Sequence, residues 1–229
     1  MLIGSALITA SSLAYFDFAT LPPFVIEKLP VRFEALWLAS LRIHVAAAAV
    51  AFPLCLLLTT RPLQRRAALH RWLGRFSGVV VLFALVPSGM VLAFDAKGGA
   101  PVTAGFLLSA AIVAGAMACG VRAARRGDLV SHRRAMRHVV GQMSVAVTSR
   151  AMLLGFDAVG FDPDLAYVIA LWVPVIGSAL VVEIASLRSR PSVRSAMQVI
   201  ERSRREFYPL ALLVRVCSPL ARPFVRLGR

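Results

Sequence analysis

The sequence predicts an all-helical membrane protein, a single bundle of about six transmembrane helices with both termini in the cytoplasm. Of the 229 residues, 59% are hydrophobic and only 16% are charged, whereas an average soluble domain is about 45–50% apolar and about 25% charged. The apolar residues form runs of about 19 to 24 residues, long enough to cross a bilayer as helices. The sequence lacks the short alternating segments of a membrane β-barrel.

The first apolar run, residues 2–26, holds a single charge, Asp17, and has a Pro22-Pro23 break near its end. It lacks the basic start and small-residue cleavage site of a signal peptide, so we interpret it as a first helix. The later spans are predicted at 35–58, 76–94, 102–121, 139–160 and 165–184.

These later runs differ in character. The second carries Arg42 and His44, and the third carries Pro87 and Gly89, a combination that predicts a kink. The fourth is rich in Ala and Gly, which suits close packing between helices. The fifth is the most polar of the set and includes Arg150.

Charges between the runs predict the orientation. Residues 61–75 hold five arginines and no acid, and residues 122–137 hold six arginines and one acid. The remaining connections are neutral or acidic, so the positive-inside rule places the arginine-rich connections in the cytoplasm. Residues 186–229 are basic and contain only a short apolar run, which predicts an interfacial cytoplasmic tail.

The net charge of +15 does not predict nucleic-acid binding, because the arginines lie in blocks between apolar runs. The expected partners are the lipid bilayer and its anionic headgroups, at about 1 kcal/mol per basic residue near the surface. Association into homo- or hetero-oligomers stays open. The three cysteines have no spacing typical of a disulfide framework or a zinc site.

A first candidate site lies within the predicted spans. Counted at 1.5 Å per residue, Arg42, His44 and Arg150 lie about 10 to 14 Å below the outer surface, and Asp17 lies about 7 Å below it. Together they would form an anion-favouring pocket for a quinone headgroup, a haem propionate or a lipid phosphate. The alternative is that Asp17 neutralises one of the arginines and the group only holds the bundle together.

A second candidate site lies at the predicted cytoplasmic face. Two motifs precede the third and fifth spans: His70-Arg71-x-x-Gly74-Arg75, and His132-Arg133 followed by His138. Antiparallel packing would bring them together, so that the imidazoles bind a metal or a haem and the arginines attract an anionic ligand. The alternative is that these side chains only reach lipid headgroups and helix ends.

Haem is the cofactor that histidines in a membrane bundle suggest. His44 lies about 20 Å from His138 along the membrane normal, so the two cannot bind one iron. A haem on His44 would need a second ligand such as Met90 or Met152, although methionines are also common core fillers.

The chain resembles a widespread family of predicted bacterial membrane proteins that is defined only as a domain of unknown function. The resemblance covers roughly Arg42 to Glu183. It rests on an ordered set of residues: His44, His70-Arg71-x-x-Gly74-Arg75, Pro87-x-Gly89, Gly98-Gly99, Gly127-Asp128, His132-Arg133-x-x-Met136, Arg150, Trp172-x-Pro174 and Glu183. Two positions depart from the family pattern, Ala135 in place of tryptophan and Val175 in place of asparagine.

The resemblance implies a multi-pass protein of the bacterial inner membrane and no established activity. The sequence has no Walker loop, His-Glu-x-x-His pair or Gly-x-Ser-x-Gly elbow, and it does not decide whether the protein is an enzyme. Two functions remain: a non-enzymatic membrane module for transport, lipid binding or assembly, or a redox protein that binds haem, metal or quinone through its histidines.

Overall fold

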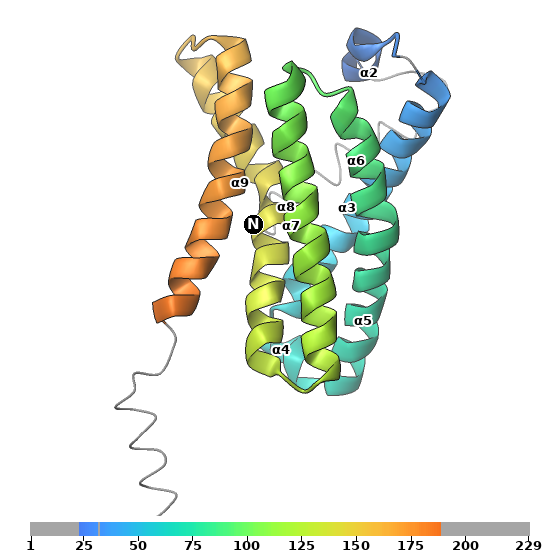
Figure 1. The fold of residues 1–229 in the computed structure, drawn as a ribbon, viewed down its shortest axis with the longest axis vertical. Coiled ribbons are helices and arrows are strands. Elements are labelled where there is room, and N and C mark those ends of the chain that lie inside the picture. The colour runs from blue at the N-terminus through green and yellow to red at the C-terminus, as the bar shows by residue number, and fades with distance from the viewer. Residues whose placement is uncertain (1–22, 32, 189–229) are drawn as a thin grey trace, which may run out of the picture. The chain divides into compact units, whose positions relative to one another are not determined.

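The computed structural model describes residues 23–31 and 33–188, and every regular element among them is a helix (Figure 1). Contacts divide the chain into one unit of residues 1–185 and a second of residues 186–229. The bundle belongs to the first unit. Most of the predicted first span and residues 189–229 of the predicted tail lie outside the described residues.

Along the chain, short helices occur among longer ones. They are α2 (Pro23–Lys28), α3 (Glu34–Leu58), α4 (Arg61–Arg65), α5 (Ala67–Val80), the π-helical turn η2 (Val81–Leu85), α6 (Val86–Phe94), α7 (Gly99–Arg125), α8 (Leu129–Ala158) and α9 (Pro163–Arg188). Five helices within the described part are long and apolar enough to cross a membrane: α3, the continuous α5–η2–α6 helix, α7, α8 and α9. These helices confirm the predicted all-helical, multi-pass membrane fold.

The third helix begins earlier than the sequence predicts. The predicted span starts at residue 76, but α5 starts at Ala67, so the motif that begins with His70 lies on a helix rather than in a loop. Alanine, leucine and arginine are all strong helix formers. Arginine lowers the hydropathy of a segment without interrupting its helix, and its long side chain reaches outward to polar surroundings.

The predicted kink at Pro87 corresponds to a π-helical turn. Pro87 has no N–H to donate to a carbonyl one turn earlier. The preceding turn widens, and the N–H of Val86 bonds to the carbonyl of Val81, five residues back. Such turns leave carbonyls free for other partners and are frequent at functional sites.

Two tight connections set the helices antiparallel. Gly98, with φ of 94°, directly precedes α7, and Gly127, with φ of 76°, lies between α7 and α8. Both are in the left-handed region that glycine adopts at low cost. Asp128 then caps α8, because its side chain accepts a hydrogen bond of 3.0 Å from the backbone N–H of Ser131.

The main core lies where α3, η2, α7 and α8 meet, around Ala51, Val81, Val113 and Val139. A smaller core joins α7, α8 and α9. Figure 1 shows α7 beside α6, and α7 and α8 run close along their length. Small residues such as Gly120, which packs against Met136, allow this approach.

Candidate functional site

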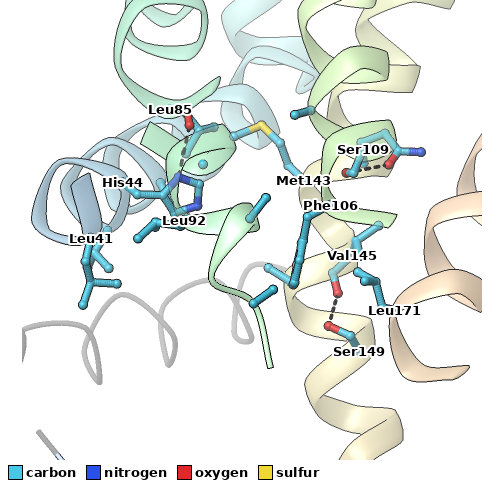
Figure 2. A pocket seen from close by; sticks show the side chains of 18 of the residues that line it. Leu41, His44, Leu85, Leu92, Phe106, Ser109, Met143, Val145, Ser149 and Leu171 are labelled. Carbon is cyan, nitrogen blue, oxygen red and sulfur yellow. Dashed lines mark hydrogen bonds between the residues drawn. The ribbon is translucent and has the colours of Figure 1, made fainter. Parts of the chain in front are cut away.

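A cavity of about 650 Å³ lies among the helices, between α3, α6, α7, α8 and α9 (Figure 2). Most of its wall is apolar, and four aromatic side chains line it: Trp37, Phe52, Phe106 and Tyr167. Its polar and charged lining residues are Lys28, His44, Asp95, Lys97, Ser109, Gln142, Ser149, Arg150 and Tyr167. The volume is in the range of a drug-sized ligand, and an apolar wall with a few polar groups is typical of binding sites.

His44 enters this cavity from α3. Its Nδ1 lies 3.1 Å from the backbone carbonyl oxygen of Leu85 and 3.3 Å from the hydroxyl oxygen of Ser88. Figure 2 shows the bond to Leu85, with Phe106 and Ser109 on the other side of the cavity. A backbone carbonyl on Nδ1 is a common way to fix the tautomer of a functional histidine.

The local sequence of α6 makes this arrangement. The π-helical turn ends at Leu85, whose carbonyl is reached by His44. Ser88 bonds to the carbonyl of Ala84 at 2.5 Å. Gly89 leaves space for the imidazole, because a β-carbon there would lie 2.8 Å from Cε1 of His44. The predicted kink motif is therefore the structural support of the predicted site histidine.

Gln142 lies in the cavity wall and is only 3% exposed. Its side-chain oxygen accepts a hydrogen bond of 2.9 Å from the Ser109 hydroxyl on α7. Its amide nitrogen donates to the Val175 carbonyl at 2.9 Å and to the Ser178 hydroxyl at 3.0 Å, both on α9. One buried amide thus joins three helices around the cavity.

One end of the cavity lies at the 95–98 connection and carries charge. Lys97, Arg150 and Tyr167 line it there, and Tyr167 lies close enough to the two cations to interact with them electrostatically. Nη1 of Arg150 donates to the Ala146 carbonyl of its own helix at 2.8 Å. A second cavity of about 340 Å³ shares Lys97 and Tyr167 with the first and extends along the 157–164 connection.

The predicted outer cluster is divided by the structure. His44 and Arg150 line one cavity, whereas Arg42 does not line it. Arg42 and His44 are two residues apart on α3, so their side chains leave the helix in directions about 160° apart. Asp17 lies outside the described residues.

The predicted cytoplasmic cluster is also divided. His132 on α8 has its Nδ1 2.9 Å from the Gly120 carbonyl on α7, and His70 lies close enough to His132 to interact with it electrostatically. His138 instead faces α9, where its Nε2 lies 2.8 Å from the Glu183 carboxylate. Six residues separate His132 and His138, which turns them to faces of α8 about 120° apart.

Glu183 is the acidic partner at this end of the bundle. It accepts hydrogen bonds from His138 and from Arg134, so two side chains of α8 bind one carboxylate of α9. Arg71, Arg75 and Arg133 are exposed. Within residues 23–31 and 33–188, no group of three or more His, Cys, Asp or Glu side chains is placed to hold a metal ion.

Met143 and Ser109 are among the lining residues that sequence reasoning missed. Met143 lines the cavity with His44, whereas Met152, named as a possible haem ligand, does not, and Met90 is 44% exposed. Ser109 lies in the Ala- and Gly-rich helix, where a lone serine gives no signal. Met143 follows the polar Gln142, but no sequence pattern shows which face of α8 meets α3.

The chain matches one protein-family model, described as a predicted membrane protein (DUF2306), over residues 41–186. The match confirms the resemblance to an uncharacterised membrane family. No curated protein and no solved structure matches the chain.

Proposed function

The chain belongs to the DUF2306 family of predicted membrane proteins, and we propose that it is a non-enzymatic membrane module that binds one lipid-soluble molecule in the cavity beside His44. The observation that carries this proposal is the cavity itself. It is about 650 Å³, it lies among helices long enough to cross a bilayer, and its apolar wall is interrupted by a few polar groups.

The chemistry of the wall favours a lipid-like ligand over a water-soluble one. Aromatic and aliphatic side chains from α3, α7 and α9 would cover its apolar part. Arg150 and Tyr167 would bind a polar group of the ligand near one end of the cavity, and His44 would bind another polar group deeper in the bundle. Reversible binding of such a molecule fits transport, lipid binding or assembly.

The orientation belongs to the same proposal: the arginine-rich connections face the cytoplasm and the protein lies in a bacterial inner membrane. The exposed Arg71 and Arg75, with the stacked rings of Trp72 and Phe76 6.1 Å apart, would then contact anionic headgroups at the cytoplasmic interface. Single cysteines at Ala100 and Ser131, in a background without native cysteines, should react with an impermeant thiol reagent from opposite sides. Labelling from one side only would refute the orientation.

A matched pair of substitutions on α7 tests the binding proposal. Ala110 lines the cavity, and the neighbouring Ala111 is exposed and does not. Protein stripped of lipid should be stabilised when a membrane lipid extract is added back, by about 2.7 kcal/mol at a hundredfold excess over Kd. Ala110→Phe fills the cavity and should lose this gain, whereas Ala111→Phe should keep it. An equal gain in all three proteins would mean that lipid acts only on the outer surface.

A redox protein that binds haem is the second candidate. It is favoured by the presence of His44 and Met143 in one cavity wall, since histidine and methionine together are haem ligands in cytochromes. Protein expressed with ample haem would then show a Soret band whose position changes on reduction. The band should disappear in His44→Ala.

A further inference from the structure

His44 lines the cavity, and residues of the π-helical turn and α6 decide which of its two ring nitrogens carries the proton. Nδ1 lies 3.1 Å from the Leu85 carbonyl and 3.3 Å from the Ser88 hydroxyl. The Ser88 hydroxyl donates a hydrogen bond to the Ala84 carbonyl at 2.5 Å. Because both groups facing Nδ1 then act as acceptors, Nδ1 carries the ring proton and donates it.

Nε2 is therefore the nitrogen with the lone pair, since a neutral imidazole has one donor and one acceptor, and a charged imidazolium is costly inside a bilayer. The ring geometry points this lone pair away from Leu85. No hydrogen bond reaches Nε2 from the described part of the chain. Gly89 closes off the α6 side of the ring, because even a β-carbon there would lie 2.8 Å from Cε1.

The ligand group that complements a lone pair is a hydrogen-bond donor. Carboxylates, phosphates and quinone carbonyls offer only acceptors to Nε2, whereas a hydroxyl donates to it. Aromatic side chains also contribute to the cavity wall, with Trp37, Phe52 and Phe106 among its residues, and aromatic walls pack well against a planar ring. These two features together select a hydroxyl carried on an aromatic ring.

We infer that the cavity binds a quinol, a membrane-soluble hydroquinone with one hydroxyl donating to Nε2 of His44. A hydroquinone has a second hydroxyl on the opposite edge of its ring, which suits a cavity with polar groups at separate places. The inference rests on the proposed function and names its ligand. It concerns binding of the reduced ring and includes no electron-transfer step.

The test measures binding through Trp37, which lines the cavity. In a Trp72→Phe/Trp172→Phe background, the fluorescence of Trp37 is titrated anaerobically with durohydroquinone, duroquinone and geranylgeraniol, a hydroxylated lipid without a ring. One neutral hydrogen bond corresponds to about a two- to twelvefold change in Kd. Durohydroquinone should therefore bind about two- to twelvefold more tightly than duroquinone, and more tightly than geranylgeraniol.

His44→Asn is the decisive variant. The asparagine amide can replace Nδ1 as the donor to Leu85, but it leaves nothing in the place of Nε2. The variant should keep its melting temperature and lose the preference for the quinol. His70→Asn is the matched control, because His70 does not line the cavity, and it should keep the preference.

Equal affinity for the two redox forms, or a preference that survives in His44→Asn, would overturn the inference. Equal binding of geranylgeraniol would show that the ring is not recognised and would also overturn it, as would a Soret band. If durohydroquinone does not bind but the lipid extract still separates Ala110→Phe from Ala111→Phe, the quinol is wrong and the proposed function stands. If both measurements fail, both proposals fall.

Discussion

The imidazole of His44 lies directly against Gly89, so that a β-carbon on that glycine would stand 2.8 Å from Cε1 of the ring. The two residues come from α3 and α6, and they meet beside the π-helical turn whose last carbonyl bonds to His44. A widened turn, a proline, a serine and a glycine thus combine to hold one side chain at the edge of the cavity.

Gly89→Ala tests this contact. The added methyl group would overlap the imidazole and move it away from Leu85, and overpacking of this kind costs about 1–3 kcal/mol. Gly115→Ala on α7 is the control, because no atom lies within 4 Å of its β-carbon position and alanine is the better helix former. Unfolding in mixed detergent should show a lower free energy of unfolding for Gly89→Ala and no decrease for Gly115→Ala. Equal stabilities would mean that the ring is free to move.

Gln142→Leu removes the amide that joins α7, α8 and α9. Interhelical hydrogen bonds in membranes contribute about 0.6 kcal/mol each to stability on average. Loss of the three bonds should therefore lower the free energy of unfolding by about 1–3 kcal/mol. Ser144→Ala removes a hydroxyl that, among the described residues, bonds only to Gly141 of the same helix, and it should change the free energy of unfolding by less than about 0.5 kcal/mol. A stable Gln142→Leu protein would show that packing alone holds α9.

Glu183→Gln weakens the attachment of α9 to Arg134 and His138. The side chains of Glu183 and Arg134 are 39% and 47% exposed, so the pair contributes at most about 1 kcal/mol and is screened by salt. The second half of α9 should exchange its amide hydrogens faster in the variant, while α7 stays unchanged. Wild type in high salt should approach the behaviour of the variant. Identical exchange at low salt would exclude a role for this contact in docking.

Asp128 gives the start of α8 a dependence on pH. Hydrogen bonding from Ser131, first through its side chain and then through its backbone N–H, holds the pKa of this carboxyl below its ordinary value. A carboxyl group whose pKa is lowered by folding contributes its full stabilisation of the folded state at pH values above its unfolded pKa. That contribution is lost as the pH falls through the lower pKa of the folded state. Amide exchange in the first turn of α8 should therefore accelerate on acidification in wild type. Asp128→Asn keeps a cap and should show no such dependence, and a pH dependence in that variant would contradict the assignment.

Hydropathy predicted the fold well because a bilayer demands long apolar helices. The helices α3, α7 and α9 each contain a predicted span, and α8 covers all of its predicted span except the last two residues. It failed at the starts of α5 and α8, which begin at Ala67 and Leu129 and not at residues 76 and 139, since arginine lowers hydropathy but favours a helix. His44 and Arg150, which the sequence grouped by depth, both line one cavity, and their role as a binding site stays a prediction. Depth alone does not give the direction in which a side chain leaves its helix.

The direction in which each side chain leaves its helix also explains the other differences between the predicted and the observed neighbours of these residues. His132 and His138 share a motif but face α7 and α9 respectively, which follows from their spacing only once the neighbours of α8 are known. Met143 could not be assigned to the cavity for the same reason. The π-helical turn has no reliable sequence signature of its own, although the proline after it marks the place.

The most direct measurement is native mass spectrometry of the protein released from mild detergent. We predict a population heavier than the bare chain by one small organic molecule. This population should be absent in Ala110→Phe, which fills the cavity, and present in Ala111→Phe, which does not. The bare mass in all three proteins, or the same adducts in all three, would contradict a ligand bound beside His44.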